Sequence, residues 1–422
     1  MNSDRIVTAT DFSHTPGWFN VLNRLWEKTY PIGSRPSLKK DELMQTAMRM
    51  TGLNDFGKDF WDEPLDRLIA SMKEEARLHA IGYFISRQRL VNLLSVRLRA
   101  EEMFKKFPAI LEQEIIPPMI IVGLQRTGTT KLHRLLTADP DNRVLKSWEA
   151  INPVPLHKLN GSKDRRIKVA KKSEKALQMM APGFFAIHPV EHLAPEEDIL
   201  LIDTTFLSTT PEATMHVPSY AAWLEETDQS VAYEYAGKLL KLLQWQTTGK
   251  QWILKSPHHL EFLPLIKKYF GNPHFLWTHR EPTECIPSFL SMVCHSRAIF
   301  SNEVSIEEVA NHWIRKTSYM LEKGLSFRET GENDNLFTDI LYENLVKEPE
   351  NQLIRIYNRN GGITDELMAQ FKKAETENPQ GKYGTHLYSY EDFGLKKEDI
   401  PRMNETYYKL FTSLKVKNEK PL

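Results

Sequence analysis

The sequence predicts an α/β fold in which a parallel β-sheet is flanked by helices and preceded by a helical N-terminal extension. Three observations support this prediction. Four short β-rich runs are separated by helical patterns, each run ends in a polar or glycine-bearing loop, and the first 112 residues contain no comparable run. Alternation of short strands with helices is typical of parallel sheets that carry helices on both faces.

The N-terminal extension is expected to be helical. The stretch LKKDELMQTAMRMTGL places Leu43, Ala47 and Met50 at helical spacing, and apolar residues recur with a 3.6 period from Leu65 to about Pro108. The arginines of this region are expected on a solvated face, paired with glutamates: Arg77, Arg87, Arg89, Arg97 and Arg99. We therefore divide the chain into a helical extension, residues 1–112, and a second unit, residues 113–422.

The composition argues against several classes of protein. The 55 basic and 55 acidic residues cancel, so a bulk attraction to nucleic acid is not indicated. Two cysteines, Cys285 and Cys294, are too few for a disulfide framework or a cysteine-rich zinc site. The start has no signal-peptide shape and no run of about 18 apolar residues occurs, so we expect no transmembrane helix and a cytoplasmic location.

The predicted strands locate the functional site. They cover Met119–Val122, Gln251–Leu254, His274–Trp277 and Leu336–Leu341. In open parallel sheets, ligands bind beyond the carboxyl ends of the strands. The residues that follow each strand are therefore the first candidates for a binding site.

The loop after the first strand has the shape of a phosphate-binding loop. GLQRTGTT, from Gly123 to Thr130, allows a tight turn, and the free N–H groups at the start of the next helix favour an anion. Arg126 adds a positive charge inside the loop. A nucleoside triphosphatase would carry lysine where Thr129 stands, to reach the β- and γ-phosphates. The loop is therefore P-loop-like, but it is built for a different anion.

The other strand ends supply more polar groups. Lys255 leaves the second strand and Arg280 leaves the third, with Ser288 eight residues further on. Tyr342 stands at the exit of the fourth strand. Because the carboxyl ends of parallel strands share one edge of the sheet, we expect Arg126, Lys255 and Arg280 to converge there.

Three of these segments together resemble the sulfotransferases that use 3′-phosphoadenosine 5′-phosphosulfate (PAPS). GLQRTGTT is similar to the family's 5′-phosphosulfate loop, usually PKSGTT or PRSGTT, and HREPTECIPSFLSM is similar to its 3′-phosphate motif. LYENLVKEP resembles the segment that begins YEDLV. Within the family, the pattern looks closest to the bacterial group that shares features with the tyrosylprotein and carbohydrate enzymes. The resemblance implies PAPS as the donor and no metal.

The resemblance also implies roles for individual residues. Arg126 and Lys255 would stabilise charge on the leaving phosphate, and Glu149 would be the catalytic base. Glu149 would reach the site after a short strand at residues 143–145, with Trp148 raising its pKa. The donor would be bound by these residues: Arg126, Thr127, Gly128, Thr129, Thr130, Arg280, Ser288 and Tyr342.

Some assignments stay open at this point. His188, His192 and His216 are alternative bases, and Lys382 and His386 are weaker candidates for the 3′-phosphate. Lys131 is expected to point outward. The acidic residues of PEEDILLID, Glu196, Glu197, Asp198 and Asp203, are expected to form a solvated helix start rather than a metal site.

The acceptor group is expected to be a hydroxyl or an amine of a small molecule, a lipid or a carbohydrate. Residues 1–112 would cap its site, and the stretch 180–235 would wall it with aromatic and apolar side chains: Phe184, Phe185, Phe206, Met215, Tyr220 and Trp223. Two other functions remain as alternatives. One is a P-loop kinase or nucleoside triphosphatase, which the absent lysine disfavours; the other is a non-catalytic nucleotide-binding protein.

Overall fold

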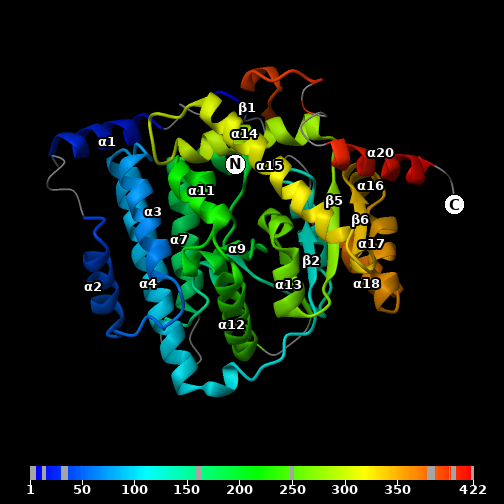
Figure 1. Ribbon diagram of the computed structural model, residues 1–422, viewed down its shortest axis with the longest axis horizontal. Coiled ribbons are helices and arrows are strands. Elements are labelled where there is room, and N and C mark those ends of the chain that lie inside the picture. Colours follow the sequence, from blue (N-terminus) through cyan, green and yellow to red (C-terminus); the bar gives the residue numbers. More distant parts are fainter. Residues whose placement is uncertain are drawn as a thin grey trace.

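The structure, a computed structural model, places a parallel β-sheet between helices (Figure 1). It describes residues 6–11, 16–29, 37–156, 164–247, 251–377, 385–398, 400 and 405–419. Figure 1 shows α2–α4 toward one end of the molecule and α16–α18 toward the other, with strands β2, β5 and β6 nearer the second group. The predicted fold class is confirmed.

The main sheet has five parallel strands in the order β3-β4-β2-β5-β6. Their bounds are Met119–Val122 (β2), Asn142–Val144 (β3), Gln251–Lys255 (β4), His274–His279 (β5) and Phe337–Leu341 (β6). All four predicted strands are present, and β3 occupies the place expected for a fifth, short one. The register pairs Ile121 with both Lys255 and Leu276, so the carboxyl ends of the central strands lie together.

Alternating side chains of the strands enter two different apolar cores, as the strand period of two requires. Met119 and Ile121 pack with α5 (Thr129–Leu136), α17 (Pro349–Tyr357) and α18 (Asp365–Glu377) on one face. Ile120 and Val122 belong to the larger core on the other face, which includes α12 (Ser230–Gln246), α14 (Pro282–Arg297) and α15 (Ile306–Arg328). Both faces of the sheet are therefore covered, which explains the nearly continuous apolar sequence of its strands.

The extension consists of helices α1 (Gly17–Thr29), α2 (Lys40–Thr51), α3 (Asp62–Glu74) and α4 (Ala80–Lys106). Leu43, Leu65 and Leu94 belong to the same apolar core as Trp277 of β5. The extension thus shares this core instead of forming one of its own. The division of the chain at residue 112 into two units stays a prediction.

The expectation that the arginines of the extension lie on a solvated face is wrong for Arg97 of α4. Its side chain is fully buried and donates hydrogen bonds to the carbonyl oxygens of Phe56 (3.0 and 3.1 Å) and Thr204 (3.2 Å). The guanidinium lies against the rings of Trp61 and Tyr235, at 5.4 and 4.3 Å. Its partners are backbone carbonyls and aromatic rings from other elements, which helical periodicity does not reveal.

A second sheet, which the sequence did not indicate, pairs β1 (Ile6–Thr8) in parallel with β7 (Thr385–Leu387). The remaining helices are α6 (Ser147–Ile151), α7 (Arg165–Met180), α8 (Pro182–Ile187), α9 (Ile199–Ile202), α10 (Thr210–Thr214), α11 (Pro218–Glu226), α13 (Leu263–Phe270), α16 (Tyr342–Lys347) and α20 (Glu405–Glu419). Short 3₁₀ turns include η3 (Asp203–Thr205) and η4 (Pro257–Glu261). In the described part of the chain, each helix is too short or too polar to cross a membrane.

Candidate active site

The loop between β2 and α5 is shaped by residues with positive φ angles. Gly123, Arg126 and Gly128 have φ values of 132°, 69° and 93°. A Cβ on Gly123 would lie 2.5 Å from the carbonyl oxygen of Thr278, and one on Gly128 would lie 2.9 Å from the ring of Tyr342. Both glycines are therefore required for the close packing of this loop against β5 and α16.

Thr127 faces the sheet instead of the expected donor site. Its hydroxyl donates to the carbonyl oxygen of Leu124 at 2.6 Å and is 2.6 Å from the hydroxyl of Thr278. The side chain is fully buried and does not line the adjacent cavity. The structure thus assigns the Thr127 side chain to the support of the loop, and corrects its expected place at the donor.

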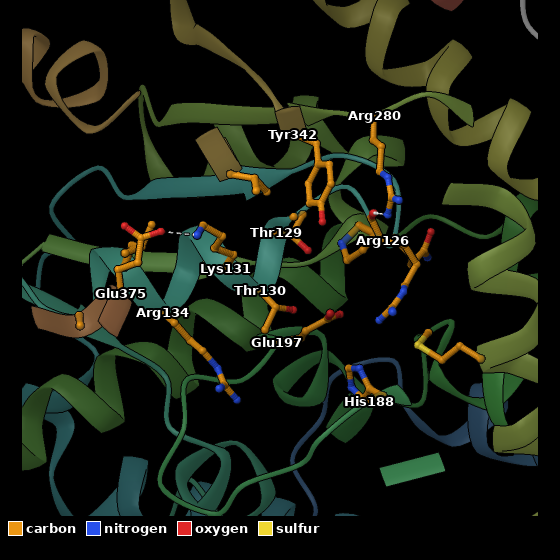
Figure 2. Close-up of a pocket in the computed structure, with 17 residues that line it drawn as sticks. Arg126, Thr129, Thr130, Lys131, Arg134, His188, Glu197, Arg280, Tyr342 and Glu375 are labelled. Carbon is orange, nitrogen blue, oxygen red and sulfur yellow. Dashed lines mark hydrogen bonds and ion pairs between the residues drawn. The ribbon is translucent and has the colours of Figure 1, made fainter. Parts of the chain in front are cut away.

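A cavity of about 250 Å³ opens next to the loop. Six of the predicted donor-binding residues line it: Arg126, Gly128, Thr129, Thr130, Arg280 and Tyr342. Figure 2 shows Tyr342 and Arg280 on one side of the cavity and Arg134, Glu197 and His188 on the other, with Thr129 and Thr130 between them. We call it the first cavity.

Two basic residues of α5 complete the first cavity, and sequence reasoning missed both. Lys131 lines it with its Nζ 2.5 Å from Glu375, and Arg134 lines it with its guanidinium 2.5 Å from Glu191. The outward orientation expected for Lys131 is therefore wrong. Their spacing of three residues, directly after Thr130, was the available signal, because residues three apart share one face of a helix.

Arg126 is held by contacts on several sides. Its Nε donates to Ser288 Oγ at 3.0 Å and its Nη1 to the carbonyl oxygen of Ile187 at 3.2 Å. Burial lowers the pKa of the guanidinium, and the nearby Arg280 adds to this effect. Ser288 itself is fully buried and does not line the first cavity, so in this structure it contacts the donor region through Arg126.

Arg280 joins the loop to the end of β5. Its Nη1 donates to the carbonyl oxygen of Arg126 at 3.1 Å, and its guanidinium lies 4.5 Å from the ring centre of Tyr342. Glu284 forms an ion pair with it at 3.0 Å. The predicted convergence of Arg126 and Arg280 at one sheet edge is therefore present in the structure.

Lys255 lies at the expected strand end but is not a free cation. Its Nζ donates to Glu197 Oε1 at 2.7 Å, and its side chain is only 4% exposed. Glu197 lines the first cavity and Lys255 does not. The expectation that Lys255 points directly into the crevice is thus corrected: a carboxylate stands between its ammonium group and the cavity.

Glu149 lies elsewhere than expected. Its carboxylate forms a two-point ion pair with Arg143, at 2.6 and 3.0 Å, and accepts a hydrogen bond from the backbone N–H of Lys146 at 3.1 Å. It lines neither the first cavity nor the neighbouring one described below. Trp148 stacks on the guanidinium of Arg166, at 4.6 Å. The position expected for Glu149, beside the reacting group, is therefore corrected.

A second cavity of about 190 Å³ adjoins the first. Five residues line both cavities: Gln125, His188, Glu197, Pro257 and Met292. Burial, followed by the charge of Lys255, lowers the pKa of His188 to about 4. The predicted wall residue Phe184 lines the second cavity, whereas residues 37–112 contribute no lining side chain to either one. The cap function expected for the extension stays a prediction.

Three other candidates line neither cavity. His192 pairs with Glu174 at 2.5 Å, His216 lies 3.4 Å from Glu308, and His386 shares a hydrogen bond with Ser291 at 2.8 Å. Lys382 lies outside the described residues.

The acidic residues of PEEDILLID are also positioned by partners. Asp198 pairs with His259 at 2.8 Å, and Asp203 forms an ion pair with Arg89. Together with the pairing of Glu197 to Lys255, these contacts replace the solvated helix start expected from the sequence. Within the described residues, no three side chains of the metal-binding types cluster closely enough to hold an ion.

Comparison with known proteins shows the family and the fold of this chain. Residues 117–365, more than half of the chain, match the model of a family described as the sulfotransferase family. The structure is similar to that of sulfotransferase STF1 from Mycobacterium tuberculosis H37Rv, with a TM-score of 0.76 and 28% identity over 86% of this chain and 98% of that one. Sulfotransferase STF9 from Mycobacterium avium supports the fold alone, with a TM-score of 0.80 and 23% identity over 89% and 97% of the chains. No curated protein matches the chain significantly.

Proposed function

The chain belongs to the sulfotransferase family, and we propose that it takes the sulfuryl group from PAPS and transfers it to a hydroxyl group of a small acceptor. The observation that carries this proposal is the pair of adjoining cavities. The first is lined by four basic side chains, whereas neither lysine nor arginine lines the second within the described residues. A donor with several negative charges and an uncharged acceptor would fit this division.

In this proposal the phosphosulfate end of the donor lies at the β2–α5 loop. The backbone N–H groups at the start of α5 and the hydroxyls of Thr129 and Thr130 would bind it, with Arg126, Lys131 and Arg134 nearby. On donor binding, Lys131 would leave its ion pair with Glu375, and Arg134 its ion pair with Glu191, to contact the donor instead. Arg280 and Ser288 are proposed for the 3′-phosphate, as the sequence motif suggests.

Transfer would proceed by in-line attack of the acceptor oxygen on sulfur. The bond between sulfur and the bridging phosphate oxygen breaks, and negative charge builds up on the leaving phosphate. Preorganised cations stabilise such charge most strongly when they need not move during the reaction. Arg126, which Ser288 and the Ile187 carbonyl hold in place, suits this role.

We assign the base to Glu197 rather than Glu149. Glu197 lines both cavities, so its carboxylate lies where donor and acceptor would meet. His188 also lies there, but burial and the charges of Lys255, Arg126 and Arg134 oppose a proton on its ring. A neutral His188 suits hydrogen bonding to the acceptor hydroxyl better than accepting its proton.

A binding experiment tests the donor assignment. Adenosine 3′,5′-bisphosphate at about 100 times its dissociation constant should stabilise the protein by roughly 2.7 kcal/mol in thermal unfolding. ATP with magnesium at the same concentration should stabilise it much less.

Transfer of labelled sulfate from PAPS to a phenol would establish turnover. Preference for ATP–magnesium would favour a kinase-like function, and tight binding without transfer to any acceptor would favour a non-catalytic nucleotide-binding protein. The cytoplasmic location expected from the sequence also remains a proposal.

A further inference from the structure

Helix α1 presents an apolar face to solvent. Four large apolar side chains on it are 45% to 54% exposed: Trp18, Val21, Leu22 and Leu25. They stand three, four or seven residues apart, so they form one stripe along the helix. Trp26, four residues after Leu22, lies 5.3 Å from the ring of Phe84 of α4, which is 37% exposed. We call the four exposed side chains of α1 together with Phe84 the α1 patch.

Another side of α1 is fixed to the rest of the fold. Phe19 and Asn23, four residues apart, are both buried. The ring of Phe19 lies edge-on to that of His79 at 5.7 Å, and Asn23 Oδ1 accepts a hydrogen bond from the backbone N–H of Ile81 at 3.2 Å. Figure 1 shows α1 lying crosswise to α3 and α4 at the outside of the molecule. The helix therefore cannot turn its apolar stripe inward without losing these contacts.

The charges of α1 border the patch on one side. Arg24 and Lys28, both exposed, follow Val21 by three and seven residues, and residues at these spacings share a helix face. Glu27 is the one acidic residue of the helix. It stands nine residues after Trp18, about two and a half turns at 3.6 residues per turn, and so lies on the opposite side of the helix. A surface that receives the patch therefore meets positive charge at its edge, and a negative surface complements it.

The size of the patch decides between two kinds of partner. Helix α1 has 13 residues and is roughly 20 Å long at 1.5 Å per residue. Half the surface of a helix of that length and about 11 Å in diameter is roughly 350 Å², less than half of the about 800 Å² that each partner of a stable protein pair buries. A lipid surface needs no such area, because a single amphipathic helix can insert its Trp and Leu side chains below the headgroups.

We propose that α1 binds the surface of a bilayer that contains anionic phospholipid. The helix would lie in the plane of the membrane, because roughly 20 Å is too short to cross a hydrocarbon core of about 30 Å. The α1 patch would enter the boundary between headgroups and acyl chains, while Arg24 and Lys28 would keep their charges at the level of the lipid phosphates. This inference goes beyond sulfuryl transfer and does not depend on it.

Flotation of the full chain with lipid vesicles tests the proposal. One set of vesicles is phosphatidylcholine alone, and the other contains equal parts of phosphatidylcholine and phosphatidylglycerol. We expect the wild type to bind the anionic vesicles more tightly, by about fivefold for each of the two bordering cations. Added salt should weaken this preference, because it screens exposed charges.

Two double variants separate the apolar and the charged contributions. Leu22→Gln with Leu25→Gln should weaken binding to both kinds of vesicle by at least about tenfold, because two half-exposed leucines no longer enter the lipid. Arg24→Gln with Lys28→Gln should bind the anionic vesicles only as well as the phosphatidylcholine vesicles. All four side chains are exposed, so thermal unfolding of both variants should stay close to that of the wild type. If the leucine variant nevertheless unfolds, the charge variant still decides, because an unchanged preference for anionic vesicles overturns the proposal.

Val169→Gln with Met179→Gln is the matched control, since both are exposed apolar side chains of another helix, α7. This variant should bind vesicles as the wild type does. The proposal is overturned if the wild type does not float with anionic vesicles, or if the control loses as much binding as the leucine variant. Light scattering tests the other occupant. A wild-type dimer that dissociates in the leucine variant would assign the patch to a second copy of this chain and overturn the lipid assignment, whereas a monomer that floats supports it.

Discussion

A carboxylate can take a proton from an alcohol only if one of its oxygens reaches the reacting hydroxyl. Glu197 lines the space shared by the two cavities, with Oε1 2.7 Å from Lys255 Nζ and Oε2 accepting a long, 3.5 Å contact from the Ser256 hydroxyl. Glu149 has both oxygens bound by Arg143 and one of them also by the N–H of Lys146. At the scale of single residues, Glu197 is therefore placed for chemistry and Glu149 for capping α6.

Exchange of each acid for its amide tests this distinction. Glu197→Gln should reduce turnover with an aliphatic alcohol by about 10² to 10⁴, the usual worth of a positioned base, with donor binding within about twofold. Glu149→Gln leaves Arg143 without its charged partner, so it should lower the melting temperature more than the turnover of the folded enzyme. Initial rates and calorimetric titrations on both variants measure this. The reverse pattern would return the base to Glu149, and loss of turnover only in His188→Gln would assign it to the histidine.

The 3′-phosphate assignment predicts a selective loss of binding. Arg280→Ala should weaken adenosine 3′,5′-bisphosphate by about 1.5–3 kcal/mol, the range for a hydrogen bond to a charged group, and should hardly affect adenosine 5′-phosphate. Calorimetry with both nucleotides measures the difference. Ser288→Ala distinguishes two possible roles of Ser288. If Ser288 contacts the 3′-phosphate, the variant should weaken binding of adenosine 3′,5′-bisphosphate alone. If Ser288 only supports Arg126, the variant should weaken binding of both nucleotides. Equal losses for both nucleotides in Arg280→Ala would contradict the assignment.

The residues that the sequence allowed us to place share one property: their position follows from local chain geometry. Thr129, Thr130 and Arg280 come directly after a strand or open a helix, so the strand end alone puts them at the site. Glu197 could not be found in this way, because its place depends on Lys255 from a strand far along the chain. The partner of a long-range ion pair is not encoded in local periodicity.

At the scale of elements, burial on both faces made the strands easy to predict. Every residue of β2 is buried, and its apolar run is bounded by Pro118 and Gly123. The helical period from Leu65 onward was also correct, but it does not form one helix. Two helices, α3 and α4, meet around residues 75–79, where the N–H of His79 donates to the carbonyl oxygen of Phe300 at 3.0 Å. That contact with a distant segment interrupts the helix without any proline.

Gly82 lies at this junction and gives a prediction at the element scale. A Cβ there would lie 2.0 Å from the carbonyl oxygen of Phe300, so Gly82→Ala should destabilise the protein by about 1–3 kcal/mol through overpacking. Gly237, inside α12, is the matched control, because its Cβ would meet only Phe270 at an ordinary 3.5 Å. Gly237→Ala should stabilise by about 0.5–1 kcal/mol through helix propensity. Thermal unfolding compares the two, and equal shifts would contradict the close approach.

At the scale of the whole molecule, the extension and the sheet share one core. The same arrangement buries charged groups between elements that lie far apart in sequence. Lys316 of α15 forms ion pairs with Glu261 of η4 at 2.8 Å and Glu225 of α11 at 3.1 Å. Glu212 of α10 lies close enough to raise the pKa of Lys316, and it binds His312 at 2.9 Å. None of these pairings could be inferred from the sequence, because each joins helices that meet only in the folded core.

This cluster predicts how stability depends on pH. Burial raises the pKa of Glu261 to about 7, from an ordinary 4.5, although Lys316 opposes the shift. Below pH 4.5 the carboxyl is protonated in both the folded and the unfolded chain. Between pH 4.5 and 7 the unfolded chain loses this proton while the folded chain keeps it, so the folded state becomes relatively less stable as pH rises. At 1.36 kcal/mol per pKa unit, the loss reaches roughly 3 kcal/mol, and it is complete above about pH 7.

Glu261→Gln removes the titrating group and keeps its shape, so the stability of the wild type relative to this variant should fall steadily between pH 5 and 7.5. Urea unfolding of both proteins across this range measures the difference. Glu63→Gln serves as the control, because Glu63 is exposed and its ion pair with Arg67 at 3.1 Å is a surface pair within one helix. Such pairs are worth about 0–1 kcal/mol, so the difference between the wild type and Glu63→Gln should stay nearly flat with pH. The opposite result, a wild type that becomes more stable than Glu261→Gln as pH rises, would contradict this prediction. It would show that Lys316 keeps the Glu261 carboxylate ionised in the folded protein.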